Sequence, residues 1–356
     1  MPLPERVSRW VLGSYAIAGA MSKIFVERVT ETIHTMGDHA NPFLPVVLCF
    51  LKRIALLYRS LVLFEVSMEA SEGYPSSVTY IGEGESIAYI MHLLTQKPAA
   101  ALSRRLPLWR LRKRLRDALH AQHIVIVEGN RLLRWCIPQA GYETVPWIRQ
   151  IVDLHDASYQ NRRPKIEATF GRLVRKNSFA YTTTQDQRRG IYFYNHVYLP
   201  YITSRYLDKT HPRAISEMHS AMKHGFLLEV YDHDRLIAGA ICRKQKHKVT
   251  AVAFGVARPH DELLRKGALS SVYYFLFKWA ESNGMKQVDL LRSRANLEDG
   301  VFEHKRRWGA RPMLDGWPHT FIRIFPVPRG GMPLLLRQQL ILHDGKWMSI
   351  SAIYPG

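Results

Sequence analysis

The order of apolar runs and turns between residues 226 and 291 places the tightest limit on how this chain folds. We expect four strands there, in chain order Phe226–Tyr231, Leu236–Arg243, His247–Val256 and Gln287–Leu291. Turn residues join the first two, and an amphipathic helix over Leu263–Asn283, closed by Gly284, separates the last two. Strands that lead into a helix and then into another strand predict an α/β fold with a mixed sheet.

A similar strand–turn–strand unit is expected in the first half of the chain. Leu61–Met68 has the pattern of a strand, Gly84–Gln96 that of a helix, and His120–Pro138 that of a hairpin turning at Gly129 and Asn130. The two hairpins lie about 105 residues apart, as a diverged tandem duplication would place them. The sequence therefore predicts two α/β units of the same type in tandem.

These units divide the chain into four expected regions. Residues 1–60 form an N-terminal helical segment, 61–160 a degenerate first domain, 161–325 the catalytic domain and 326–356 a C-terminal extension. The boundary between the two domains is expected at Asn161–Pro164, and one more strand at Thr320–Phe325.

The charge balance favours an anionic partner. The 356 residues carry 50 Lys and Arg against 30 Asp and Glu, a formal net charge of +20. Such a surplus suits nucleic acid, acidic lipid headgroups or phosphorylated substrates, and the alternative is a basic surface without a specific partner. Three scattered cysteines, with no C-x-x-C or H-E-x-x-H pattern, argue against a disulfide framework and a metal site. We therefore expect a cytoplasmic protein that uses no metal.

Two N-terminal stretches bear on membrane contact. Residues 10–21 are only a weak match to a signal peptide, because polar residues interrupt the apolar run. Pro42–Phe64 is more apolar but carries Lys52, Arg53 and Arg59, which are too many charges for a spanning helix. This stretch is either a core helix with a basic face or a helix in the membrane interface.

A dense run of arginine and lysine occupies Arg104–Arg116. Leu108, Leu111 and Leu115 recur in it at helical spacing, so the pattern predicts a helix with one apolar and one basic face. The basic face would suit tRNA phosphates or acidic headgroups, and the alternative is a solvated helix face.

Short motifs in the second half carry a resemblance to a known family. They are Phe193–Asn195 with Tyr201–Tyr206, Leu236–Ala240, Trp279–Gly284, Val288–Leu290 and Phe302–Pro312. Together these stretches resemble the C-terminal domain of the FemAB-like branch of the GNAT superfamily, which includes peptidoglycan bridge aminoacyltransferases. The family commonly has a helix ending W-A-x-x-x-G, a strand with Asp, and then F-K-x-x-(W/F)-G. Here His304 stands in place of the Phe before Lys305.

The resemblance implies where an acyl donor binds. In this fold the third and fourth core strands splay apart and expose backbone groups to the extended arm of the donor. The helix between them presents its N-terminus to a pyrophosphate. The implied donor-binding residues are Arg265, Lys266, Gly267 and Ala268 at the start of that helix, and Arg292 and Ser293 after the fourth strand.

The resemblance also implies catalytic residues. Lys305 would hold a phosphate or stabilise the developing oxyanion, unless it is an ordinary surface lysine. Glu229 or Asp289 could act as the general base, or the reaction could proceed without a dedicated base. Tyr274, or its neighbour Tyr273, could protonate the leaving thiolate or hydroxyl.

The implied substrate-binding residues are Arg205, Tyr206, His304 and Trp308. Arg205 could clamp a carboxylate or phosphate, or form a structural salt bridge. For Trp308 the favoured alternative is packing against the last strand.

These features together predict an acyltransferase of the GNAT type that moves an acyl group from acyl-CoA to an amine, with acyl-CoA as co-substrate. Aminoacyl-tRNA is the alternative donor. The acceptor would be a small molecule or a cell-envelope precursor, with peripheral contact to the inner face of an anionic membrane as a further expectation. A rival interpretation is a non-catalytic envelope protein that binds acidic lipid or polysaccharide.

Overall fold

The computed structural model describes residues 61–68, 77–82, 86–87, 89–90, 98–121, 123–130, 133–206, 212–314, 320–325, 341–343 and 347–349. The expected N-terminal segment 1–60 and most of the expected helix Gly84–Gln96 lie outside this part of the chain. Within the described residues, no helix combines the length and the apolar character needed to cross a membrane.

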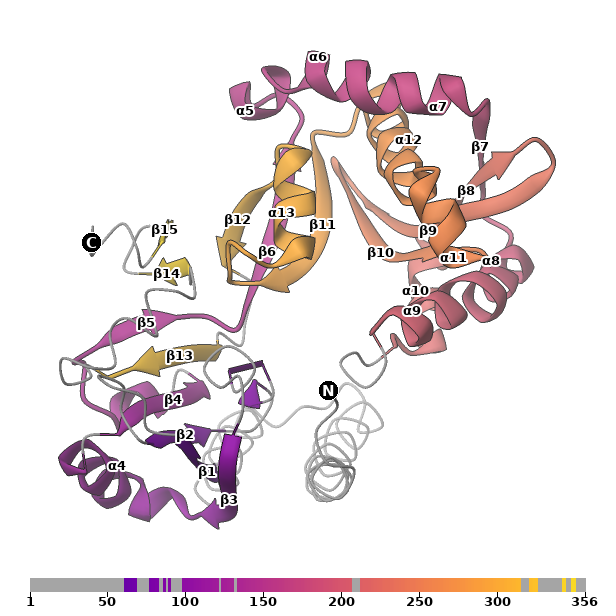
Figure 1. The fold of residues 1–356 in the computed structure, drawn as a ribbon. Coiled ribbons are helices and arrows are strands. Elements are labelled where there is room, and N and C mark those ends of the chain that lie inside the picture. The colour runs from indigo at the N-terminus through magenta and orange to yellow at the C-terminus, as the bar shows by residue number, and fades with distance from the viewer. Residues whose placement is uncertain are drawn as a thin grey trace, which may run out of the picture. The chain divides into compact units, whose positions relative to one another are not determined.

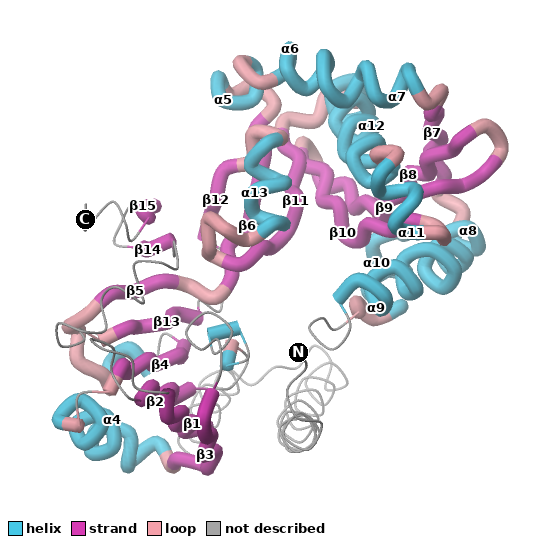
Figure 2. Tube along the Cα trace, in the orientation of Figure 1, coloured by secondary structure: helices cyan, strands magenta, loops and turns pink. Residues whose placement is uncertain are grey.

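The described residues form two mixed sheets (Figures 1 and 2). The first has eight strands in the order β15-β14-β5-β13-β4-β2-β1-β3. Their bounds are β1 Leu61–Met68, β2 Ser77–Gly82, β3 Pro98–Leu106, β4 Ile124–Asn130, β5 Tyr142–Thr144, β13 Thr320–Ile324, β14 Ile341–His343 and β15 Trp347–Ser349. Only the β2–β4 pair is parallel among these described strands, so this sheet is mixed, as predicted.

The hairpin predicted over His120–Pro138 is wrong in its second strand. After β4 the chain enters a short 3-10 helix, Leu133–Trp135, and the partners of β4 are β2 and the distant β13. The Asn130 side-chain oxygen accepts the backbone N–H of Leu133 at 3.4 Å. Such a local side-chain bond competes with strand pairing and starts a helical turn.

The basic run Arg104–Arg116 is also only partly helical. Its first residues, Arg104 and Arg105, belong to strand β3, which ends before Pro107. A 3-10 helix, Leu108–Arg110, then leads into α4, Leu111–His120. Leu111, Leu115 and Ala118 are the buried residues of α4, so its apolar face is confirmed. The helix starts later than expected because Pro107 disfavours the helical conformation at the residue before it, Leu106.

The second sheet has seven strands in the order β12-β6-β11-β10-β9-β8-β7. Their bounds are β6 Trp147–Asp153, β7 Phe179–Thr184, β8 Gly225–Asp232, β9 Arg235–Gln245, β10 Lys248–Val256, β11 Gln287–Arg294 and β12 Arg311–Leu314. The four strands predicted between residues 226 and 291 are confirmed as β8 to β11. Strand β6 precedes the expected boundary at Asn161–Pro164 yet belongs to this sheet, while β13 follows it and belongs to the first.

Helices cover both faces of the second sheet. Their bounds are α5 Ala157–Gln160, α6 Arg163–Ile166, α7 Arg172–Lys176, α8 Gln187–Phe193, α9 Leu199–Tyr206, α10 Ile215–Lys223, α11 His260–Arg265, α12 Ala268–Ser282 and α13 Gly300–Arg307, with π-helical turns at Glu167–Gly171 and Tyr194–Tyr198. Side chains alternate between faces along each strand. Leu228 and Val230 accordingly pack with α12, while Leu227 packs with α8 and α10.

The single helix predicted over Leu263–Asn283 is two helices. Gly267 lies between α11 and α12 with φ of +88°, a left-handed conformation that glycine adopts at little cost. The predicted end at Gly284 is confirmed, with φ of +64°.

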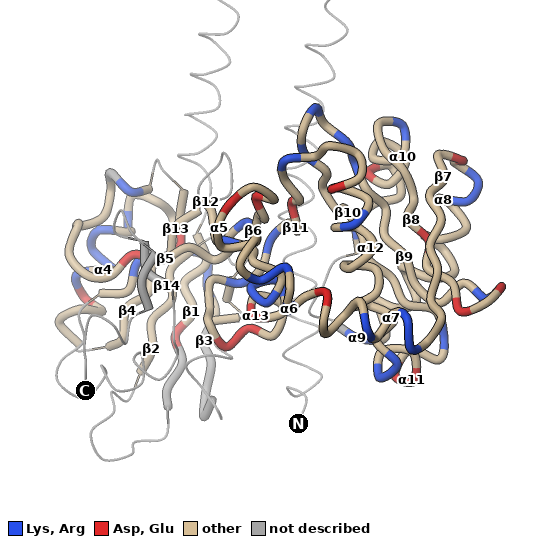
Figure 3. The backbone as a smooth tube through the Cα atoms, turned by 90° about the horizontal axis from the view of Figure 1, so that it is seen from above, with Lys and Arg blue, Asp and Glu red and all other residues tan. Residues whose placement is uncertain are grey.

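Residues 157–176, expected to contain a domain boundary, are largely helical. Pro164 lies in the first turn of α6, where its missing N–H breaks no helical bond. The π-helical turn joins α6 directly to α7, so 163–176 is one continuous helical stretch. Figure 3 marks the lysine and arginine positions of this stretch in blue.

Candidate functional site

Strands β10 and β11 pair at one end and separate at the other. Their parallel register joins Lys248 to Gln287, Val249 to Val288 and Thr250 to Asp289, and these are the only pairs that the two fully described strands make. Beyond this point β10 continues to Val256 beside β9, and β11 continues to Arg294 beside β6 (Figure 1). The predicted splay between the third and fourth core strands is therefore confirmed.

A bulge in β11 produces the separation. The β6–β11 register shifts between Asp289 and Arg292, and Leu291 has φ of +62°, an unusual conformation for a residue with a branched side chain. The Asp289 carboxylate accepts the backbone N–H of Leu291 at 2.9 Å and pairs with Arg149 at 2.7 Å. Asp289 is fully buried, and its carboxylate is committed to these two contacts at the bulge.

Lys305 reaches the separated part of β11. It lies on α13 and is only 4% exposed, and its ammonium nitrogen donates to the backbone oxygen of Arg292 at 2.7 Å. Burial lowers the pKa of Lys305 to about 7, against the opposing effects of Asp299 and Asp289. A buried amine of this kind is a candidate functional group, because lysine is almost never fully buried and strongly lowered pKa values cluster at functional sites.

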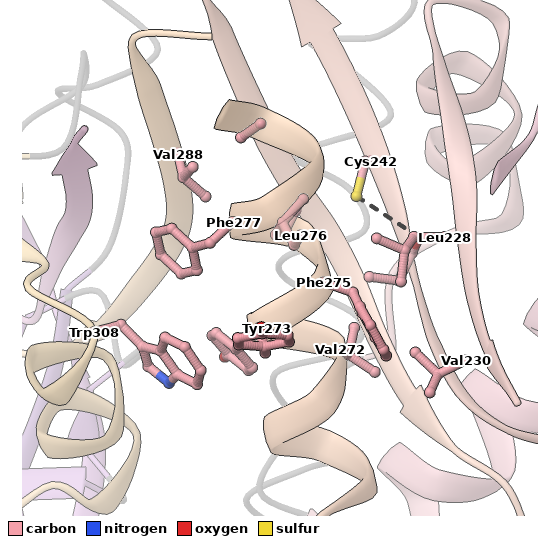
Figure 4. Close-up of a cluster of buried hydrophobic side chains, with 14 of the residues drawn as sticks. Leu228, Val230, Cys242, Val272, Tyr273, Phe275, Leu276, Phe277, Val288 and Trp308 are labelled. Carbon is pink, nitrogen blue, oxygen red and sulfur yellow. Dashed lines mark hydrogen bonds between the residues drawn. The ribbon is translucent and has the colours of Figure 1, made fainter. Parts of the chain in front are cut away.

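Aromatic rings surround the adjacent turn of α13. Tyr273 of α12 lies between Phe254 of β10 and Trp308, with ring centroids 4.5 Å and 5.6 Å away, and meets the edge of His304 at 4.8 Å. Figure 4 shows Trp308, Tyr273 and Phe277 side by side in this cluster. Burial, with the charges of Arg307 and Lys305, lowers the pKa of His304 to about 4, so its imidazole is neutral near pH 7.

Two ring nitrogens in this cluster are buried without a hydrogen-bond partner among the described residues. They are Nε2 of His304 and the indole nitrogen of Trp308. Unsatisfied buried donors and acceptors cost free energy, so these two nitrogens are an unusual feature of the cluster. The expectation that Trp308 packs in the core holds as well, since it is fully buried.

The expected donor loop lies at the start of α12. Gly267 packs against Leu173, and Ala268 is buried as the first residue of the helix. Arg265 and Lys266 are exposed, and Lys266 pairs with Glu262 at 2.9 Å. Tyr273 follows Ala268 by five residues, a rise of about 7.5 Å along the helix. The α12 start is therefore about one and a half turns from the Tyr273–His304 contact.

Two predicted catalytic residues lie elsewhere. Glu229 is on β8, with β9 between it and β10, and its carboxylate pairs with Arg189 at 2.6 Å. The Tyr274 hydroxyl bonds to both carboxylate oxygens of Glu167 at 3.0 and 3.1 Å. Each of these side chains is therefore committed to a partner other than Lys305. Tyr273, the alternative to Tyr274, is the tyrosine that contacts this cluster.

Four predicted site residues remain, two on β11 and two on α9. Arg292 is exposed on β11 and offers its carbonyl to Lys305, whereas Ser293 is buried and donates to Gln150 of β6 at 2.7 Å. Arg205 is exposed on α9. Tyr206 ends that helix, and its side chain lies outside the described residues.

Sequence reasoning missed the contribution of β6 to this site. Arg149 holds Asp289, and the Gln150 side chain donates to the backbone oxygen of Phe302 on α13 at 3.1 Å. Both lie about 140 to 150 residues from their partners, and no local pattern marks such distant pairs. Among the described residues, no group of three or more His, Cys, Asp or Glu side chains is arranged to hold a metal ion.

Several solved structures are similar to this chain at low identity. L-PGS from Bacillus licheniformis matches at 12% identity over 76% of this chain and 83% of its own, with a TM-score of 0.37. FemX matches at 11% over 74% and 84%, with a TM-score of 0.36. A GCN5-related N-acetyltransferase from Kribbella flavida matches at 12% over 80% and 95%, with a TM-score of 0.26. No protein-family model and no curated protein matches the sequence.

Proposed function

We propose that this protein transfers an acyl group from acyl-CoA to the amine of an acceptor. The proposal rests chiefly on the divergence of β10 from β11 beside the buried amine of Lys305. The facing backbone edges beyond Thr250 and Asp289 offer N–H and C=O groups to the amide-containing arm of the donor. The start of α12, with exposed Arg265 and Lys266 beside it, suits the donor's phosphates.

In the proposed reaction, the acceptor nitrogen attacks the thioester carbon and the carbonyl oxygen gains negative charge. The protonated Lys305 donates a hydrogen bond to that oxygen, and its burial strengthens the interaction. The carbon–sulfur bond then breaks, the thiolate leaves with the proton released by the acceptor amine, and an amide remains. No side chain near Lys305 is assigned as a general base, because the carboxylates of Asp289 and Glu229 are both ion-paired.

An aminoacyl-tRNA is the second candidate donor, favoured by the formal net charge of +20. In that case the ester to the ribose hydroxyl takes the place of the thioester. The same backbone edges and the same lysine would serve either carrier, since both present an extended arm that ends in an activated carbonyl.

Transfer of a radiolabelled acetyl group from acetyl-CoA to a set of small amines tests the proposal. We expect transfer by the wild-type protein and loss of at least about a hundredfold in rate for Lys305→Met, as for removal of one oxyanion donor. The matched control is Lys286→Met, because Lys286 is exposed and lies before β11. Equal rates for Lys305→Met and the wild type would contradict the role of Lys305. If the protein transfers nothing from acetyl-CoA but does transfer from aminoacyl-tRNA, then acyl-CoA is not the donor and aminoacyl-tRNA is.

A further inference from the structure

The helical segment 157–176 carries a concentration of positive charge that the proposed reaction does not use. It contains six lysines and arginines and one carboxylate, Glu167. Its buried side is formed by Tyr159, Ile166, Gly171 and Val174, and all six cations are exposed. The charge is therefore presented to solvent along one stretch of backbone.

Among the residues that the structure describes, carboxylate partners are found for two of these six cations. Arg163 pairs with Glu281 at 3.1 Å, and Arg175 pairs with Glu167 at 2.8 Å. Arg162, Lys165, Arg172 and Lys176 have no carboxylate partner in the described part of the chain. We call these four residues the cationic ridge. From Arg162 to Lys176 a helix rises about 21 Å, which matches about six phosphates of one strand of a duplex.

Further cations adjoin both ends of the ridge. Arg162 donates to the backbone oxygen of Arg306 at 3.0 Å, which brings the ridge to the cationic end of α13. At the other end, Asn177 donates to the backbone oxygen of Lys266 at 3.5 Å, and Leu173 packs against Gly267. A polymer bound along the ridge would therefore reach the start of α12.

The ridge lacks the apolar anchors of a membrane-binding surface. Between its cations, Ala168 and Thr169 are exposed, and none of the large apolar side chains found exposed in the described residues lies within 157–176. Interfacial helices combine cations with a buried apolar face, whereas phosphate backbones are held by cations and small polar groups. The surface thus fits a linear polyanion better than a bilayer.

We propose that the cationic ridge binds the sugar–phosphate backbone of a nucleic acid, without reading its sequence. The inference goes beyond transfer from acyl-CoA, because none of the four side chains lies in the Lys305 cluster, and the same surface would also suit the second candidate donor, aminoacyl-tRNA. Its chemistry is charge neutralisation, so binding should weaken steeply as salt rises.

Fluorescence anisotropy with a labelled RNA duplex of about 12 base pairs, titrated between about 50 and 200 mM salt, tests the proposal. The ridge variant is Lys165→Glu/Arg172→Glu/Lys176→Glu in the full chain. The matched control, Arg188→Glu/Lys223→Glu/Lys246→Glu, makes the same change in net charge at exposed positions on α8, on α10 and after β9.

We expect the ridge variant to bind at least about tenfold more weakly than the control, and its plot of log affinity against log salt to be shallower by about 2 to 3. Lys305→Met should bind like the wild type, which separates this surface from the transfer site. Equal weakening in the ridge and control variants would overturn the proposal. It would also be overturned if the ridge variant lost binding to anionic vesicles while its RNA affinity stayed at the wild-type value.

Discussion

Replacing Lys305 by Met should make the protein more stable at neutral pH while removing transfer. Burial places the pKa of Lys305 at about 7 in the folded chain, compared with 10.5 when solvated. The difference of about 3.5 pH units, at about 1.4 kcal/mol each, means that keeping this lysine charged below pH 7 costs up to about 5 kcal/mol of folding free energy. This figure is the net effect of burial and of the favourable contacts of the ammonium group, which include its hydrogen bond to the Arg292 oxygen.

The sign of the pH dependence follows from proton binding. Between pH 7 and 10.5 the unfolded chain holds a proton on Lys305 that the folded chain has released, so this residue makes stability rise with pH. The stability advantage of Lys305→Met over the wild type should therefore shrink by about 3 kcal/mol between pH 6 and 9.5. Other titrating groups cancel in this comparison because both proteins contain them.

Urea unfolding followed by circular dichroism at several pH values measures this difference. Lys286→Met is the control, and its exposed lysine should give a difference from wild type that does not vary with pH. If the stability difference between Lys305→Met and the wild type were the same at pH 6 and pH 9.5, Lys305 would not be a buried lysine with a lowered pKa.

Three further predictions concern the same sheet. Gly255→Ala should cost about 1 to 3 kcal/mol in urea unfolding, because an added Cβ would lie 3.0 Å from backbone atoms of Tyr198, whereas Gly300→Ala meets no atom within 4 Å and should change little. Asp289→Asn should lower the free energy of unfolding by about 2 to 4 kcal/mol and weaken donor binding in calorimetry, since it breaks a buried ion pair. Unchanged stability and affinity would show that the bulge does not shape the donor site. If protonated Lys305 is the active form, the transfer rate should fall above pH 7 in the wild type, and Lys305→Arg should lose that decline.

The sequence predicted the parts of the fold that local patterns specify. Strands β8 to β10 follow one another closely and β11 follows a marked helical segment, so local apolar runs and turn residues were enough to find all four. Strand β4 was given the wrong partner, because its true neighbour β13 lies about 190 residues away and only the assembled sheet brings them together. Gly267 was missed as a helix break, since glycine within a helical pattern is often tolerated.

In the candidate site too, residues close in sequence were predicted together, whereas contacts between distant residues were not. His304 and Lys305 lie in the last turn of α13 and Trp308 directly follows it, so a short motif could indicate them together. Glu229 and Tyr274 were chosen by residue type, and the structure shows each of them bound to a charged partner from another element. Arg149, which secures the bulge through Asp289, belongs to a strand expected in the other domain. Pairing across such a distance leaves no trace in local composition.

Hydrogen exchange at the backbone amides of β10 and β11 tests most directly whether these strands stand apart to receive a donor. We predict that amides within Ala251–Val256 and Leu290–Arg294 that face one another exchange quickly in the free protein and slow markedly when the donor is bound, while the β8–β9 pair stays slow throughout. Slow exchange in the free protein over both segments, at the level of β8 and β9, would mean that the two strands are joined along their length and would contradict the proposed binding place.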